Sequence, residues 1–252
     1  MAPSAWHAPV TPRSVVRRHR VHSTAMTATA SVPGFRPSRH GLHFANRFPH
    51  VAPISIPLGP FGELPIGDAA DGLCGGMAFV VRDHWERHQP PPLDTEPPAP
   101  GSPLFRLLVR RQVESFDWLR VPLRFYSLQA FRPERPDPFA KVLRRRSRTG
   151  ETILEWRRIR REIDAGRLAP IGLVRTVSPN PLELRSNHQA LAYGYEVEGD
   201  RLRLFLYDPN HPDRDDVEVR MRLGVERRGP ATMLQTTGEP LEAFCLLPYR
   251  GA

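Results

Sequence analysis

The segment HQALAYGYEVEGDRLRLFLYDPN, residues 188–210, contains two apolar runs separated by a short turn. In the second run, Leu202, Leu204 and Leu206 alternate with residues of the opposite face, a period of two that is typical of a β-strand. The intervening Glu198-Gly199-Asp200 has the composition of a tight hairpin turn. The segment therefore predicts an antiparallel hairpin with strands at residues 189–197 and 201–207.

The rest of the chain places predicted helices before this hairpin and predicted strands around it. Apolar residues recur at helical spacing in three segments, residues 75–86, 103–118 and 151–165. Ser102-Pro103 has the composition of a helix N-cap followed by a first-turn proline. Further extended runs are predicted at residues 121–130, 170–177, 217–223 and 242–247. Helices followed by antiparallel strands predict an α+β fold.

Two segments are predicted to lie outside the regular elements. Residues 1–35 mix small, polar and basic residues without apolar periodicity, so a disordered basic extension is expected there. Residues 89–103 contain seven prolines and are predicted to form a surface insertion. The remaining residues, 36–252, are long enough to bury the core of a single domain.

Charge and composition narrow the function classes. The chain has 36 basic and 27 acidic residues, and Lys141 is its single lysine. No nucleic-acid reader motif accompanies the arginines, so a nucleic-acid partner is a minor alternative, based on Arg144–Arg148 and the N-terminal arm. No apolar stretch approaches the length of a membrane span. We predict a cytoplasmic protein; Arg17-Arg18 makes twin-arginine export the alternative.

Cys74 is the candidate nucleophile. It stands in the run DGLCGGMAF, residues 71–79, where a thiol precedes two glycines and then an apolar stretch of helical period. A helix that begins after Cys74 would direct its unpaired N–H groups and the positive end of its dipole at the sulfur, which favours the thiolate. The alternative is a small buried core residue, a common position for a free cysteine. Cys245 is too distant in sequence to suggest a disulfide framework.

A nucleophilic thiol needs a base, and the base needs an orienting group. His188 begins the first hairpin strand, and Asp208 follows the last residue of the second. With the turn near Gly199, these ends lie roughly opposite each other, so we expect His188 and Asp208 to meet. Asn210 is an alternative orienting group. The alternative interpretations are a structural histidine and an ordinary strand-terminating turn.

Metal sites are weakly indicated. Acidic and amide residues are dense just after the hairpin, and their oxygens could bind calcium, but the prolines and the missing glycine do not fit an EF-hand loop. These residues are Asp208, Asn210, Asp213, Asp215 and Asp216. His84 and His88 are four residues apart without a nearby third ligand. No metal and no cofactor are predicted.

Together these features resemble the papain-like cysteine peptidase superfamily. The run IDAGRLAPIGLV at residues 163–174, NHQALAYGY at 187–195, LYDP at 206–209 and the Cys74-Gly75 pair look most like the branch that includes bacteriocin-leader peptidases. In that fold the cysteine opens a central helix, and histidine and then Asp or Asn follow on a strand hairpin. The resemblance covers roughly residues 60–225.

The resemblance implies a cysteine hydrolase with a Cys74-His188-Asp208 triad, acting through a thioester on a peptide, protein or other amide. Two departures from the family pattern bear on this expectation. Asp68 stands where relatives place a glutamine that donates to the oxyanion, and a carboxylate cannot donate. Asn46 and the backbone N–H of Cys74 are the replacement donors, and the proline-rich insertion would alter the groove. The alternative function is an inactive papain-like module that binds protein or peptide.

Overall fold

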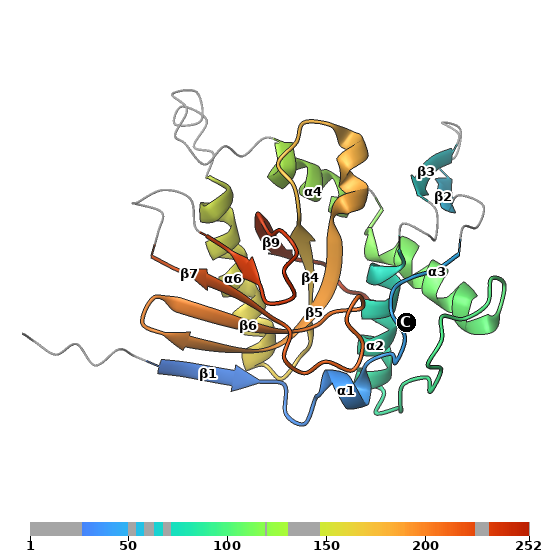
Figure 1. Ribbon diagram of the computed structural model, residues 1–252, viewed down its shortest axis with the longest axis horizontal. Helices are drawn as coiled ribbons and strands as arrows, with labels where there is room; N and C mark the ends of the chain where they lie inside the picture. Colours follow the sequence, from blue (N-terminus) through green and yellow to red (C-terminus); the bar gives the residue numbers. More distant parts are fainter. Residues whose placement is uncertain are drawn as a thin grey trace, which may run out of the picture.

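The computed structural model describes residues 27–49, 54–57, 63–67, 72–118, 120–130, 147–224 and 232–251. These residues form helices packed around a large antiparallel sheet, which confirms the α+β class (Figure 1). Within the described ranges, no helix combines the length and the apolar character that a membrane crossing requires. The N-terminal residues 1–26, with Arg17-Arg18, and the arginines at 144–146 lie outside the described residues.

Within the described residues the main sheet has seven strands and is organised around the predicted hairpin. Its order is β8 (Leu234–Gln235), β7 (Glu218–Arg222), β6 (Arg201–Tyr207), β5 (His188–Glu198), β4 (Ala169–Val174) and β9 (Ala243–Leu246), with β1 (Thr27–Ser31) also on β5. All of these pairs are antiparallel. One edge of β5 pairs with β6, while β4 and then β1 share its other edge. β5 is therefore the strand that ties the sheet together.

The strands predicted around the hairpin are confirmed within a few residues at their ends. A separate two-stranded sheet, formed by β2 (Ile54–Pro57) and β3 (Glu63–Gly67), has no counterpart among the strands predicted above. The two-residue strand β8 was not predicted either. A strand this short carries too few residues for a period of two to be visible.

The three predicted helices are confirmed, and one segment that was predicted as extended is also a helix. The confirmed helices are α2 (Cys74–Glu86), α3 (Pro103–Ser115) and α6 (Arg148–Asp164), with a four-residue α1 (Pro37–His40) and a 3-10 helix η3 (Pro181–Ser186) in addition. Residues 121–130, predicted as extended, form helix α4 (Arg120–Ala130). Val121, Phe125 and Leu128 lie at helical spacing and are buried, so burial of this face outweighs the strand preference of its residues.

The ordered chain begins earlier than predicted. Residues 27–35 were expected in the disordered extension, but β1 pairs in register with the second half of β5, from Thr27 opposite Glu198 to Ser31 opposite Gly194. Val32 and Phe35, which follow β1, are buried. Backbone pairing and two apolar anchors hold a segment whose composition alone indicated disorder. The proline-rich segment 89–102 contains no helix or strand, as predicted.

Helices α6 and α2 cover opposite faces of the sheet. Alternate residues of a strand point to opposite faces. On β5, Ala190 and Ala192 join the core formed with α6, whereas Leu191 joins the core formed with α2. The N-terminal end of α2 thereby comes to the start of β5, and this contact brings the candidate nucleophile to the hairpin.

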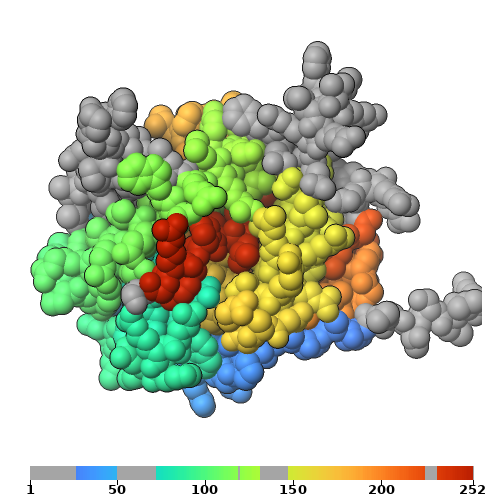
Figure 2. Space-filling model, turned by 180° about the vertical axis from the view of Figure 1, so that it is seen from behind, coloured from blue at the N-terminus to red at the C-terminus, as the bar shows by residue number. Residues whose placement is uncertain are grey.

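The C-terminal residues lie against α2 and α3. On the face seen in Figure 2 they occupy the space between the surfaces of α2, the α3–α4 region and α6. The buried Arg111 guanidinium donates to Asp83 at 2.8 Å and to the Arg250 carbonyl at 3.0 Å. The Tyr249 hydroxyl donates to the same Asp83 carboxylate at 2.5 Å. A buried ion pair thus ties the two helices and the C-terminal segment together.

We predict that Gly76→Ala destabilises the protein, although alanine is the better helix former by about 1 kcal/mol. A Cβ on Gly76 would lie 2.1 Å from the Leu108 carbonyl oxygen of α3, which is backbone and cannot rotate away. We expect the free energy of unfolding, measured with urea, to fall by about 3 kcal/mol. Gly224→Ala is the control, because its nearest neighbour would be the Asp200 Cβ at 3.8 Å. Equal stability of the two variants would contradict the close packing of α2 and α3.

Candidate active site

The first turn of α2 is held in place by side chains from distant segments. Cys74 is the first residue of the helix. The Leu73 N–H donates to Asn46 Oδ1 at 2.6 Å, and the Gly76 N–H donates to Gln112 Oε1 at 2.8 Å. The first N–H groups of a helix lack acceptors within the helix. Here the side-chain oxygens of Asn46 and Gln112 are the acceptors. The positive end of the helix is thereby positioned at the Cys74 sulfur.

Gly75, the residue after Cys74, permits a close approach of three elements. A Cβ on Gly75 would lie 2.3 Å from Ser115 Oγ of α3 and 2.7 Å from Gln189 Oε1 of β5. The amide of Gln189 in turn donates to Ser115 Oγ at 3.2 Å. Because Gln189 directly follows His188, this contact sets how far the start of β5 stands from Cys74.

His188 and Asp208 meet as the hairpin predicts. His188 Nε2 lies 2.6 Å from Asp208 Oδ1, and both side chains are buried. In the register, Leu191 is opposite Tyr207, which places Asp208 opposite Ala190. Asp208 is then the diagonal neighbour of His188 on the same face, a separation that side chains of this length span.

The second oxygen of Asp208 also has a partner. Gln235 Nε2 of β8 donates to Asp208 Oδ2 at 2.7 Å, and the Asn210 backbone N–H donates to Oδ1 at 2.9 Å. Burial alone would raise the pKa of Asp208, but the charge and hydrogen bond of His188 outweigh it, so the pKa lies well below its ordinary value. Asp208 is an ionised carboxylate that orients His188.

The Cys74 sulfur is paired with His188. Burial tends to raise the pKa of the Cys74 thiol, but the charge of His188, its hydrogen bond and the backbone N–H groups of Gln189 and Gly75 lower it below the ordinary 9.0. Burial likewise tends to lower the pKa of His188, but Asp208 and Cys74 raise it to about 10. Both shifts favour a thiolate beside an imidazolium, which is a nucleophile paired with a proton donor.

The other predicted residues have different positions. Asn46 Nδ2 donates to Asn210 Oδ1 at 3.1 Å, and the Asn46 backbone N–H donates to the Pro209 carbonyl at 2.9 Å. Asn46 therefore connects Leu73, the residue before Cys74, to the turn after Asp208. Asn210 acts on Asp208 through its backbone, while His188 bonds to Asp208 itself. Asp68 lies outside the described residues.

The acidic residues after the hairpin do not converge on a common point. Asp215 accepts from the Ser38 N–H and hydroxyl, Asp213 pairs with His43, and Asp216 pairs with Arg214. Among the described residues, no group of three or more His, Cys, Asp or Glu side chains is arranged to hold a metal ion. The alternative of a calcium loop therefore has no support from the arrangement of these carboxylates.

Several residues of the site were not predicted. Gln235, Gln112 and Ser115 act from β8 and α3, far from the hairpin in sequence, and nothing in their local pattern marks them. Asn187 is different, because it directly precedes His188: its Oδ1 accepts from the Arg175 N–H at 3.0 Å, and its Nδ2 donates to Gln129 Oε1 at 3.1 Å. Its position directly before His188 could have identified it from the sequence.

Cys245 differs from Cys74 in every respect that matters for reactivity. It lies on β9 in a core cluster with α4, and burial raises the pKa of its thiol to about 12. Among the described residues it has no histidine partner. A structural cysteine and an activated cysteine are thus present in one chain.

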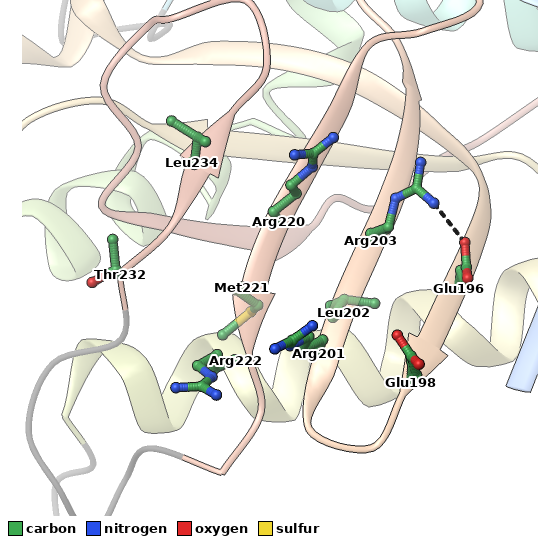
Figure 3. Close-up of a pocket in the computed structure, with 10 residues that line it drawn as sticks. All are labelled: Glu196, Glu198, Arg201, Leu202, Arg203, Arg220, Met221, Arg222, Thr232 and Leu234. Atoms are coloured by element: carbon green, nitrogen blue, oxygen red, sulfur yellow. Dashed lines mark hydrogen bonds and ion pairs between the residues drawn. The ribbon is translucent and has the colours of Figure 1, made fainter. Parts of the chain in front are cut away.

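A hollow on the outer sheet face lies among β5, β6, β7 and β8, and none of its lining residues belongs to the Cys74 site (Figure 3). The register places Arg201 opposite Arg222 and Arg203 opposite Arg220, and such like-charge pairs are unfavourable on their own. Carboxylates offset them: Arg203 pairs with Glu196 at 2.7 Å, and Glu218 bonds to both Arg203 and Arg220. We call this face the ion-pair ladder, because arginines of β6 and β7 alternate on it with the carboxylates of Glu196 and Glu218. It is therefore not an uncompensated basic surface.

Comparison of the chain with models of protein families, with curated proteins and with solved structures finds no match in any of the three. Function is therefore argued from the site.

We predict that the rate at which iodoacetamide alkylates Cys74 rises with pH to a midpoint below the ordinary thiol pKa of 9.0, because the charge and hydrogen bond of His188 lower the pKa of the Cys74 thiol. Mass spectrometry of a Cys245→Ser background follows the one remaining thiol. His188→Ala removes the cation while burial persists, so the midpoint of its rate profile should move to a higher pH. A wild-type rate that climbs towards a midpoint near 9.0 would show an ordinary thiol.

Proposed function

We propose that the protein is a cysteine hydrolase of papain-like fold that cleaves a peptide or another amide. The observation that carries the proposal is the continuous buried chain of contacts from the Cys74 sulfur to the His188 ring and from His188 to the Asp208 carboxylate. The nucleophile opens a helix, and its partners come from a later antiparallel hairpin. This order of elements is the one that the resemblance to papain-like peptidases implies.

The first half of the reaction forms an acyl-enzyme. The Cys74 thiolate attacks the carbonyl carbon, a C–S bond forms, and the electron pair of the C=O bond moves to the oxygen. When the tetrahedral species collapses, the C–N bond breaks and His188 gives its proton to the leaving amine. The Cys74 N–H is the backbone donor we assign to the developing oxyanion. The product is a thioester on Cys74.

The second half returns the enzyme to its starting state. Neutral His188 takes a proton from a water molecule as the water oxygen attacks the thioester carbonyl. The C–S bond then breaks, Cys74 leaves as a thiolate beside the protonated His188, and the acyl group departs as a carboxylic acid. Asp208 keeps the ring orientation through both halves and stabilises its positive charge, but exchanges no proton itself.

One observation favours a second candidate, a papain-like module that binds peptide without turnover. Cys74 is only 8% exposed, so a substrate carbonyl needs an opening of the site to reach the sulfur. The same contacts among Cys74, His188 and Asp208 would then hold a groove together rather than carry out chemistry. The two candidates differ in whether Cys74 becomes acylated.

We expect p-nitrophenyl acetate to acetylate Cys74 in a rapid burst of p-nitrophenol, because the reagent needs only the nucleophile and an activated carbonyl. Intact-mass and peptide analysis would locate the acetyl group. His188→Ala should slow the acylation by a factor of about 10² to 10⁴, the usual contribution of an acid–base group.

Cys245→Ser is the matched control and should retain the full burst, because the pKa of Cys245 is raised to about 12. Acetylation that is equally fast in His188→Ala and the wild type would contradict the assigned role of His188. Absence of any acetyl-Cys74 in a folded wild-type protein would favour the binding module.

A further inference from the structure

Arg175, the residue after β4, is a buried arginine with very little compensation. The residue is 9% exposed, and its one side-chain hydrogen bond within the described residues is a long one, from Nη1 to the Pro240 carbonyl at 3.4 Å. No carboxylate of the described part of the chain lies within 4.0 Å of its guanidinium. A guanidinium has five N–H donors, so most of its donors are left for another partner.

Other buried arginines of the chain are neutralised. Arg82 pairs with Glu86 at 2.7 Å, Arg111 pairs with Asp83 at 2.8 Å, and Arg148 lies 3.8 Å from Glu242. Removing a cation from water without a paired anion is costly, so proteins compensate buried charges. Arg175 departs from the pattern that the same protein follows elsewhere.

The position of Arg175 relates it to the active site. Leu173, two residues earlier, is opposite His188 in the β4–β5 pair, and the Arg175 N–H donates to the side chain of Asn187. The negative charges that act on its guanidinium are those of Asp208, Glu239 and Cys74. Arg175 thus shares the electrostatic environment of the reacting sulfur.

The two carboxylates near Arg175 have their hydrogen bonds elsewhere. Asp208 bonds to His188 and Gln235, and Glu239 pairs with His211 at 2.6 Å and accepts from the Thr237 hydroxyl. Neither is free to turn to Arg175 without breaking those contacts. Within the described residues neither carboxylate satisfies the guanidinium, which leaves its donors available to a bound ligand.

We propose that Arg175 is a substrate-binding residue that receives a carboxylate, so that the substrate of the Cys74 site is an acidic peptide. This inference rests on the proposed function and narrows its substrate class. A carboxylate and a guanidinium form two parallel hydrogen bonds, which orient the substrate as well as hold it. The carboxylate is either the C-terminus of the peptide or the side chain of Asp or Glu.

The first experiment compares two alkylating reagents on the full chain. The Cys74 thiolate displaces iodide from both iodoacetate and iodoacetamide, but only iodoacetate carries a carboxylate. We expect the ratio of the iodoacetate rate to the iodoacetamide rate to fall about tenfold in Arg175→Gln, the effect of losing one charged hydrogen-bond partner. Arg175→Lys, which keeps the charge but not the planar fork, should give an intermediate ratio.

Arg222→Gln is the matched control, because it removes the same charge from the exposed ladder on β7, remote from the Cys74 site. Its rate ratio should equal that of the wild type. An unchanged ratio in Arg175→Gln overturns the proposal. Slow reaction of Cys74 with iodoacetamide itself contradicts the proposed function instead, so the two failures are distinguishable.

The second experiment needs no reactive thiol and separates the two sources of the carboxylate. N-acetyl-Ala-Ala-Ala offers a C-terminal carboxylate, N-acetyl-Ala-Glu-Ala-amide offers a side-chain carboxylate, and N-acetyl-Ala-Ala-Ala-amide offers neither. We expect one of the acidic peptides to raise the thermal unfolding midpoint of the wild type but not of Arg175→Gln. A midpoint that neither acidic peptide raises above the neutral peptide overturns the proposal.

A pair of methionine variants controls for folding. Arg175→Met leaves no buried ion pair broken, so its unfolding midpoint should not fall, whereas Arg111→Met leaves Asp83 without its cation and should lower the midpoint. If Arg175→Met falls as far as Arg111→Met, Arg175 has a structural role and the proposal fails.

Discussion

The hydrogen bond between His188 and Asp208 is the interaction on which the site depends. A buried imidazole keeps its proton at neutral pH only where negative charge replaces the lost water, and Asp208 supplies that charge from 2.6 Å away. Asp208 in turn stays ionised without exposure because it accepts from His188, Gln235 and the Asn210 N–H. The protonated ring then stabilises a thiolate at Cys74, so each charge of the group is compensated by the next.

The fold supplies this arrangement through close contacts between its elements. Gly75 and Gly76 let α3 and β5 approach α2 more closely than any side chain would allow. Asn46 connects the loop before Cys74 to the turn after Asp208. Segments far apart in sequence therefore meet at one point, the N-terminal end of α2 beside the first residue of β5.

Much of this could be predicted from sequence because the decisive patterns are local. The β5–β6 hairpin is visible in the alternation of Leu202, Leu204 and Leu206, and it brings His188 and Asp208 together over 20 residues of chain. Cys74 is marked by the glycines that follow it.

The errors come from long-range effects. Helix α4 was predicted as extended because Val, Phe and Tyr favour strands, and only its packing against β4 and β9 decides for the helix. Strand β1 was assigned to disorder because its Thr-Ala alternation has small side chains, and its order comes from backbone pairing with β5. Gln235 and Arg175 reach the site through the sheet, so no neighbouring residue in the sequence identifies them.

The most direct test of the account is the protonation state of His188 measured by nitrogen NMR of the imidazole ring in the folded wild-type protein. The account predicts that both ring nitrogens carry protons well above the ordinary histidine pKa of 6.5, and that the ring loses a proton only near pH 10. A ring that is neutral between pH 6.5 and pH 10, with a pKa close to 6.5, would contradict the thiolate–imidazolium pair and with it the account of the site.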